Sequence, residues 1–150
     1  MLVSQKSRYA LRAVFELALR HGQGPVKVAD IAAAQAIPLR FLEVILGQLK
    51  QAGFVESRRG NVGGYLLARF PDRITVGEVL EFIQGPVNLL DCTDGYSKGK
   101  CPLLGNCVFL PMWEKVQDAI SGIYDNTTFE NLVEQQKKMD NGRYTHCYSI

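Results

Sequence analysis

The order of secondary-structure patterns in the N-terminal half constrains the fold more than any other feature of this 150-residue chain. A helical pattern with a broad apolar face starts after Ser4, a suitable N-cap, and turn residues end it at 21–25. A second, alanine-rich helix is predicted over 28–35. A third is predicted over 38–52, opening with a proline and stopped by Gly53. The tight turn between the last two is the connection of a helix-turn-helix.

A basic, glycine-rich hairpin follows these helices. Residues 54–57 and 64–68 have the composition of strands, and the connection between them carries Arg58 and Arg59 among glycines. Three helices followed by such a hairpin predict a winged helix-turn-helix, so the expected fold class is mainly α.

The C-terminal half predicts further helices on either side of a long loop. Thr75 and Glu78 have capping-box spacing and open a helix that reaches about Gln84. A fifth helix is predicted over 111–124, and its apolar stripe consists of Met112, Val116, Ile120 and Ile123. The N-terminal domain could cover this stripe, but so could a second copy of the chain. We favour the second copy, which makes this element a long C-terminal dimerisation helix.

These boundaries divide the chain into four parts. The winged helix-turn-helix domain is expected over 1–84, and a cysteine-containing loop without helical or strand period over 85–110. Dimerisation helices are expected over 111–138, the last of them opened by a second capping-box pattern, Thr127 with Glu130 three residues later. The remainder, 139–150, is expected to be a tail.

Charge is distributed unevenly along the chain. The first 70 residues carry ten Lys/Arg and four Asp/Glu, a net +6, whereas residues 71–150 carry seven and eleven, a net −4. A basic N-terminal half favours a polyanionic partner such as DNA. The chain has no apolar run long enough for a membrane span and no secretory signal, so we expect a cytoplasmic protein. In that reducing compartment the four cysteines are better explained as metal ligands or redox thiols than as disulfides.

Three of the cysteines, Cys92, Cys101 and Cys107, lie in the long loop, with eight and then five residues between them. Thiolates are the usual ligands of iron–sulfur clusters, and a loop with several glycines can wrap one. Structural zinc sites more often contain cysteine pairs two to four residues apart, which this loop lacks. A thiol redox switch and three unremarkable free cysteines stay open as alternatives.

Candidates for DNA contact come from three elements. On the third helix, Arg40 and Glu43 lie outside the predicted buried face, and these types can read guanine and cytosine. That buried face is predicted to consist of Phe41, Leu42, Ile45, Leu46 and Leu49. The hairpin candidates, suited to phosphate or minor-groove contact, are Arg58, Arg59, Gly60 and Gly64. The start of the first helix adds Ser4 and Lys6 as phosphate contacts, although Ser4 could simply cap.

Three stretches of the sequence resemble the Rrf2 family of winged helix-turn-helix transcription regulators, and its IscR-like and NsrR-like members in particular. They are 4–12 (SQKSRYALR), 37–43 (IPLRFLE) and 59–67 (RGNVGGYLL). The resemblance covers nearly the whole chain to about Glu134. It implies a homodimer without enzymatic activity that binds palindromic double-stranded promoter DNA, with crossed long helices at the interface.

The same resemblance implies roles for individual residues. Glu43 is similar to a glutamate that helps choose between DNA sites, and Arg59 to an arginine that enters the minor groove. The three loop cysteines match the ligands of an iron–sulfur cluster that senses iron–sulfur status, redox state or nitric oxide, with a two-iron (2Fe–2S) cluster favoured over a four-iron (4Fe–4S) cluster. Leu110 and Arg8 replace the residues that supply a fourth ligand in sensing members. Candidates for that ligand are Asp91, Asp94, Asn106, His146, Cys147, water or a small thiol.

Two other functions stay open from the sequence. A cluster-free regulator of the same fold would respond to thiol oxidation or to a protein partner. A cysteine-dependent enzyme would need a base near its nucleophile, and neither His21 nor His146 is near the three cysteines in sequence.

Overall fold

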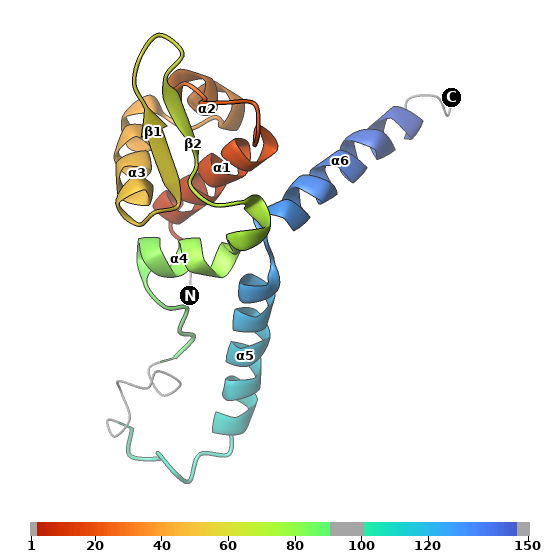
Figure 1. Ribbon diagram of the computed structural model, residues 1–150. Helices are drawn as coiled ribbons and strands as arrows, with labels where there is room; N and C mark the ends of the chain where they lie inside the picture. Colours follow the sequence, from red (N-terminus) through yellow and green to blue (C-terminus); the bar gives the residue numbers. More distant parts are fainter. Residues whose placement is uncertain (1–2, 91–100, 147–150) are drawn as a thin grey trace.

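The computed structural model describes residues 3–90 and 101–146, which form a mainly helical chain with one two-stranded sheet (Figure 1). The N-terminal domain consists of three helices and a β-hairpin. These elements are α1 (Gln5–Leu19), α2 (Val28–Gln35), α3 (Leu39–Gln51), β1 (Val55–Arg58) and β2 (Gly64–Leu67). The predicted winged helix-turn-helix is therefore confirmed, including the order of its parts.

α1 lies at the centre of this domain. Ala10, Ala13 and Val14 on this helix are fully buried, and Leu17 is nearly so. α2, α3, α4, α6 and β2 all contact α1. The alanines let these neighbours approach closely, which explains how one amphipathic helix can contact five other elements.

The hairpin is fixed to the helices through the segment that precedes α2. Val26 and Tyr65 exchange two backbone hydrogen bonds, each 2.8 Å long. Gly64 lies so close to the Val26 carbonyl group that an added Cβ atom would overlap it. Packing inside the protein thus requires this glycine, whereas the sequence suggested a tight turn and a close approach to DNA.

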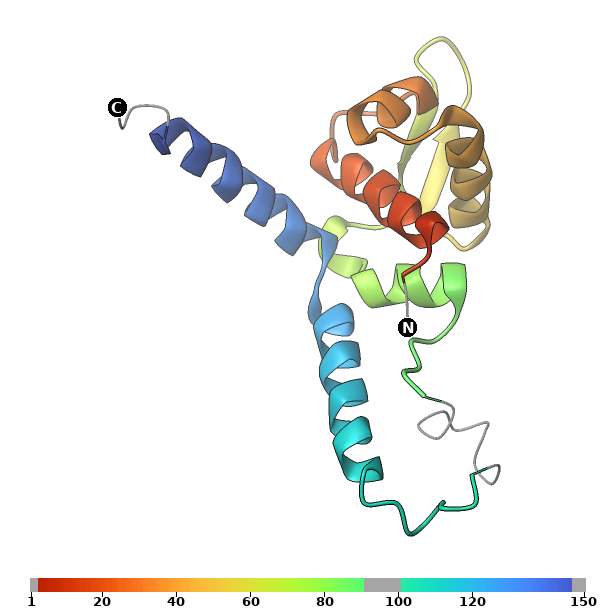
Figure 2. The same cartoon turned by 180° about the vertical axis from the view of Figure 1, so that it is seen from behind.

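The C-terminal helices leave the domain in different directions (Figures 1 and 2). The 3-10 turn η1 (Pro71–Arg73) leads to α4 (Val76–Gln84), which packs against α1. α5 (Leu110–Asn126) contacts α4, while α6 (Phe129–His146) contacts α1 and buries Phe129 and Val133. None of the described helices combines the length and the apolar content that a membrane crossing requires.

The predicted start of α6 is wrong by one residue. Thr128, not Thr127, caps the helix: its hydroxyl accepts from the Asn131 N–H at 3.1 Å, and the Asn131 side chain accepts from the Thr128 N–H at 3.0 Å. Thr127 instead donates its hydroxyl to the Ile123 carbonyl group at the end of α5. Adjacent threonines, each followed three residues later by an acceptor (Glu130 or Asn131), made both caps compatible with the sequence.

The predicted end of α6 is also wrong. The helix continues to His146, through part of the segment predicted as a tail, rather than ending at about Lys138. The last turns of α6 are mostly polar, so the sequence there lacks the helical spacing of apolar residues on which the prediction depends.

α4 begins with the predicted capping box. The Thr75 hydroxyl accepts from the Glu78 N–H at 3.2 Å, and the Glu78 carboxylate accepts from the Thr75 N–H at 2.9 Å. Arg69 donates to the same carboxylate at 3.0 Å. Partial burial raises the pKa of Glu78, but the hydrogen bonds from Thr75 and the charge of Arg69 together outweigh it, so the pKa lies below its usual value.

We expect Glu78 to make stability depend on pH in the acid range. Because its pKa is lower in the folded than in the unfolded chain, the ionised carboxylate stabilises the fold above the unfolded pKa, and this contribution is lost as the pH falls through the folded pKa. Urea unfolding between about pH 7 and about pH 3 should show a smaller loss of stability on acidification in Glu78→Gln than in wild type. Glu81→Gln, at an exposed position of α4, is the matched control, and identical curves for the two variants would contradict this role.

Candidate nucleic-acid interface and cysteine segment

A buried glutamate with two side-chain partners holds the helix-turn-helix in place. Glu16 on α1 is only 5% exposed and accepts from Arg20 Nε at 2.6 Å and from Gln35 Nε2 at 2.7 Å. Gln35 ends α2, and the chain turns there through Ala36, whose φ of 50° is left-handed. A buried carboxylate is stable only when it is paired, so this network fixes the end of α2 and thereby the start of α3.

α3 exposes its N-terminal turns to solvent. Arg40 and Glu43 are exposed, as predicted. Phe41 is 62% exposed and lies beside them, so its predicted place on the buried face is wrong. The buried residues of α3 are Leu42, Ile45, Leu46 and Leu49. Phe41 precedes Leu42 by one residue, which places it about 100° around the helix from Leu42 and at the edge of the core stripe.

An apolar hollow of about 580 Å³ lies between α1 and α3, next to this exposed face. The ring centroids of Tyr9 and Phe41 are 6.4 Å apart across it, and Val44, which is 61% exposed, lies beside them. Gln5 and Lys6 line its α1 side. The sequence did not indicate this surface, because apolar residues in an amphipathic helix are first assigned to the core.

The two predicted phosphate contacts at the start of α1 differ: Ser4 is already hydrogen-bonded within the protein, whereas Lys6 is exposed. The Ser4 hydroxyl caps the helix by accepting from the Ser7 N–H at 3.0 Å, and the Ser4 N–H donates to Gln84 Oε1 at 3.2 Å. Lys6 is exposed, and the backbone N–H groups of Gln5 and Lys6 have no hydrogen-bond partner among the described residues. Such unpaired N–H groups at a helix start are suited to bind a phosphate.

The hairpin presents its basic residues to solvent. Arg58 and Arg59 are both exposed, and Arg58 forms a long ion pair with Glu56, with 3.8 Å between their nearest charged atoms. Gly60 has a φ of 111°, a conformation that favours glycine at the tip. The predicted wing residues therefore lie together at the end of the hairpin.

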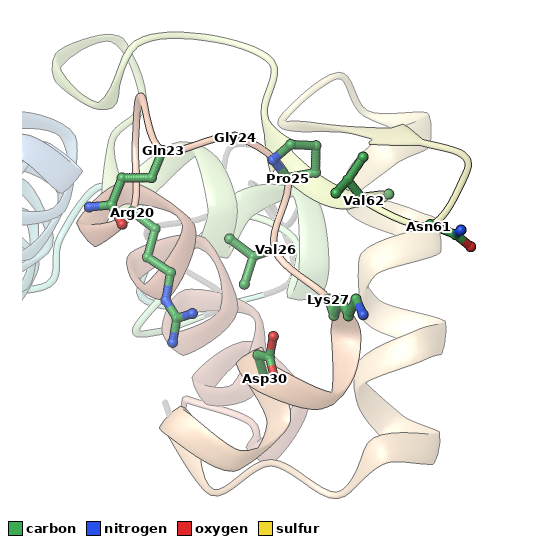
Figure 3. Close-up of a pocket in the computed structure, with 10 residues that line it drawn as sticks. Arg20, Gln23, Gly24, Pro25, Val26, Lys27, Asp30, Asn61 and Val62 are labelled. Atoms are coloured by element: carbon green, nitrogen blue, oxygen red, sulfur yellow. The ribbon is translucent and has the colours of Figure 1, made fainter.

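A second hollow, of about 340 Å³, separates the wing from the end of α1 (Figure 3). Val62 lines it from the wing and is 86% exposed, whereas Arg20, Lys27 and Asp30 line it from the helical side. The tip of the wing thus stands clear of the helices, as a hairpin that reaches DNA must.

The structure describes two of the three predicted cluster ligands. Cys101 is exposed and Cys107 is half-buried, and both are free thiols. Each lies at a turn: the Cys101 carbonyl group accepts from the Leu104 N–H at 3.1 Å, and the Cys107 carbonyl group from the Leu110 N–H at 3.2 Å. The third ligand, Cys92, lies outside the described residues, as do Asp91, Asp94 and Cys147.

These thiols fit a cluster in the chemistry of their donors. They are soft ligands on a segment that leaves them accessible, which is the type of donor that iron–sulfur clusters take. Within the described residues, no three His, Cys, Asp or Glu side chains come close enough together to hold a metal ion.

Comparison with known proteins decides the family. The Rrf2 model, described as an iron-dependent transcriptional regulator, matches residues 3–135. The chain belongs to the Rrf2 family. Membership makes this Rrf2 protein a DNA-binding transcription regulator and not an enzyme, and the match extends from the N-terminal domain into α6.

Two kinds of relative resemble this Rrf2 protein to a similar degree. The regulator CymR of Bacillus subtilis is 34% identical over 132 residues, which cover 88% of this chain and 89% of that protein. The regulator IscR of Escherichia coli is 36% identical over 148 residues, which cover 97% and 90%. Whatever this Rrf2 protein senses must therefore be inferred from its own residues.

Solved structures give the same result for the fold. CymR of B. subtilis, described as the global cysteine regulator of that organism, matches with a TM-score of 0.74 and 33% identity, over 90% of this chain and 98% of that one. IscR of T. potens matches with a TM-score of 0.74 and 31% identity, over 93% and 90%. The winged helix-turn-helix with C-terminal helices is common to all three.

Removal of the wing arginine should weaken DNA binding without unfolding the protein. We expect Arg59→Ala to lower the affinity for duplex DNA about three- to tenfold and the slope of log affinity against log salt by about one, because one backbone or minor-groove contact is lost. The loss should be larger on A·T-rich duplexes, whose narrow minor groove attracts arginine. Fluorescence anisotropy at several salt concentrations measures both effects.

The matched control for the wing variant is Arg73→Ala, an exposed arginine in η1. It should leave affinity and salt slope as in wild type. If Arg59→Ala also binds like wild type, the wing does not contact DNA.

Proposed function

We propose that this Rrf2 protein is a cytoplasmic, homodimeric transcription regulator of palindromic operators, and that an iron–sulfur cluster on Cys92, Cys101 and Cys107 controls its affinity. The observation that carries the proposal is the position of these cysteines in the chain. They lie between α4, which packs against the DNA-binding domain, and α5, which extends away from it. A ligand that fixes this segment also constrains how α4 and α5 are placed.

The proposed DNA contacts combine charged and apolar groups. Arg40 and Glu43, on the exposed first turns of α3, would read base edges in the major groove. Phe41 and Val44 beside them offer apolar contact to thymine methyl groups. Lys6 and the first turn of α1 would bind a phosphate, and the wing arginines would enter the minor groove.

A second copy of the chain is proposed to cover α5. No residue of this helix is buried, and three members of its apolar stripe are 45% (Met112), 38% (Val116) and 66% (Ile123) exposed. The N-terminal domain of the same chain leaves them open, which favours the second copy as their cover. A two-fold contact between such helices buries the stripe on both copies and places two recognition helices for half-sites about one DNA turn apart.

The cluster would add sensitivity to iron supply, redox state or nitric oxide when bound. Cys101 and Cys107 are available as thiolate ligands, Cys92 is the third by resemblance, and a 2Fe–2S cluster is favoured over 4Fe–4S. The description of the family as iron-dependent supports this assignment. The four functional parts given by the sequence are retained in the proposal, with the change that the helix begun in the dimerisation part runs on to His146.

An absorption spectrum with iron and sulfide analysis tests the cluster. Wild type purified without oxygen should be brown with matching iron and sulfide contents, and the Cys92→Ala/Cys101→Ala/Cys107→Ala variant should be colourless. Cys147→Ala tests the one cysteine outside the trio, which is a candidate for the fourth ligand: an unchanged spectrum excludes Cys147 from the site, and a changed spectrum includes it. Absence of iron from both wild type and variant would leave a cluster-free regulator, switched by thiol oxidation or by a protein partner.

A charged residue in the α5 stripe should separate the dimer. We expect Ile123→Asp to shift the protein from dimer to monomer in sedimentation equilibrium at micromolar concentration, because the proposed contact would bury an unpaired carboxylate on each copy. Phe70→Asp, at a position 67% exposed in the N-terminal domain, is the control and should stay dimeric. A dimeric Ile123→Asp variant would place the interface elsewhere.

A further inference from the structure

The first turn of α1 and the last residue of α4 share a closed polar junction. Gln84 Oε1 accepts from the Ser7 hydroxyl at 2.7 Å and from the Ser4 backbone N–H at 3.2 Å. The Ser4 and Ser7 hydroxyl oxygens lie 2.8 Å apart, and the Ser7 N–H donates to Ser4 Oγ at 3.0 Å. The junction therefore joins residues that are 80 positions apart in the sequence.

The number of protons on the two serine hydroxyl groups determines which group donates in each hydrogen bond of the junction. The Ser7 hydroxyl has one proton, which it donates to Gln84, so the Ser4 hydroxyl must donate to Ser7. Every donor of the two serines is then used once, and Gln84 takes part in the junction through its amide oxygen. Because Ser7 is fully buried, no solvent can replace that oxygen if it is removed.

The chain that follows Gln84 is anchored a second time, on α5. The Gln117 side chain accepts from the Leu89 N–H at 2.9 Å and donates to the Val87 carbonyl group. The segment between α4 and the cysteines is thus attached to α1 at one end and to α5 near the other. In Figure 2 the chain leaves the end of α4 close to the start of α1.

We propose that Gln84 is a positioning residue for DNA binding, whose amide oxygen holds the first turn of α1 so that the unpaired N–H groups of Gln5 and Lys6 point at a DNA phosphate. This inference rests on the proposed function, in which that turn lies against DNA. Backbone N–H groups bind a phosphate only when they point at it, and the ends of helices fray most easily. Gln84 does not touch the DNA. It also ends α4, so a change in the path of the following segment reaches the α1 turn through it.

A substitution that removes only the acceptor tests this role. We expect Gln84→Leu to lower the affinity for a mixed-sequence duplex of about 30 base pairs about three- to tenfold, and its salt slope by about one, because a phosphate contact is lost for any sequence. Gln23→Leu makes the same chemical change at an exposed position beyond the other end of α1 and should bind like wild type. Circular dichroism at the binding temperature confirms that both variants are folded.

Ser7→Ala provides an independent variant, because alanine fits the buried helical position and removes the hydroxyl that Gln84 holds. It should lose affinity and salt slope as Gln84→Leu does. The double variant should lose no more than the stronger single variant, since both changes break one junction. A purely structural role would lower the stability of these variants without changing the salt slope.

Two results would overturn the positioning role. One is wild-type affinity and salt slope in Gln84→Leu, and the other is losses that multiply in the double variant. In either case wild type still binds the duplex, so the proposed function survives. If wild type itself binds no duplex, the proposed function fails and the positioning role fails with it.

Discussion

α1 packs against α2, α3, α4, α6 and β2 at once, and it can do so because small, fully buried residues such as Ala10 and Ala13 line its contacts. Close approach of several elements to one helix gives the domain a single shared core. The recognition helix, the wing and the first turn of α6 each contact α1, and the recognition helix also contacts strand β1 of the wing. A change in the orientation of α1 therefore alters all of them together.

The two ends of α1 carry different polar networks. Toward its C-terminus, buried Glu16 pairs with Arg20 and holds the end of α2, which sets where the recognition helix begins. At its N-terminus, Ser7 is held by Gln84 at the end of α4. The first network belongs to the helix-turn-helix alone, whereas the second connects it to the chain that leads to the cysteines. Among the described residues, the bond between Ser7 and Gln84 thus links the first turn of α1 to the end of α4, where the chain continues toward the cysteines.

The sequence determined the features that depend on local chemistry. Hydrophobic periodicity predicted the order of three helices and a hairpin, and it also predicted that Arg40 and Glu43 are exposed. Short-range hydrogen bonding predicted the capping box of Thr75 with Glu78. The apolar stripe of α5 was also predictable as a stripe. The cysteine spacing and the family motifs likewise indicated a regulator, because those residue types occur at fixed positions along the chain.

Only the tertiary structure decided which apolar and polar groups meet across the chain. Phe41 belongs to an amphipathic pattern, yet the contacts of α1 and α3 leave it exposed beside the DNA-reading residues. Thr127 and Thr128 both have the local sequence of an N-cap, and only the packed structure shows that Thr128 caps α6. The junction of Ser7 with Gln84 joins residues 77 positions apart. No local sequence pattern predicts this hydrogen bond, because it forms only when α1 and α4 pack together.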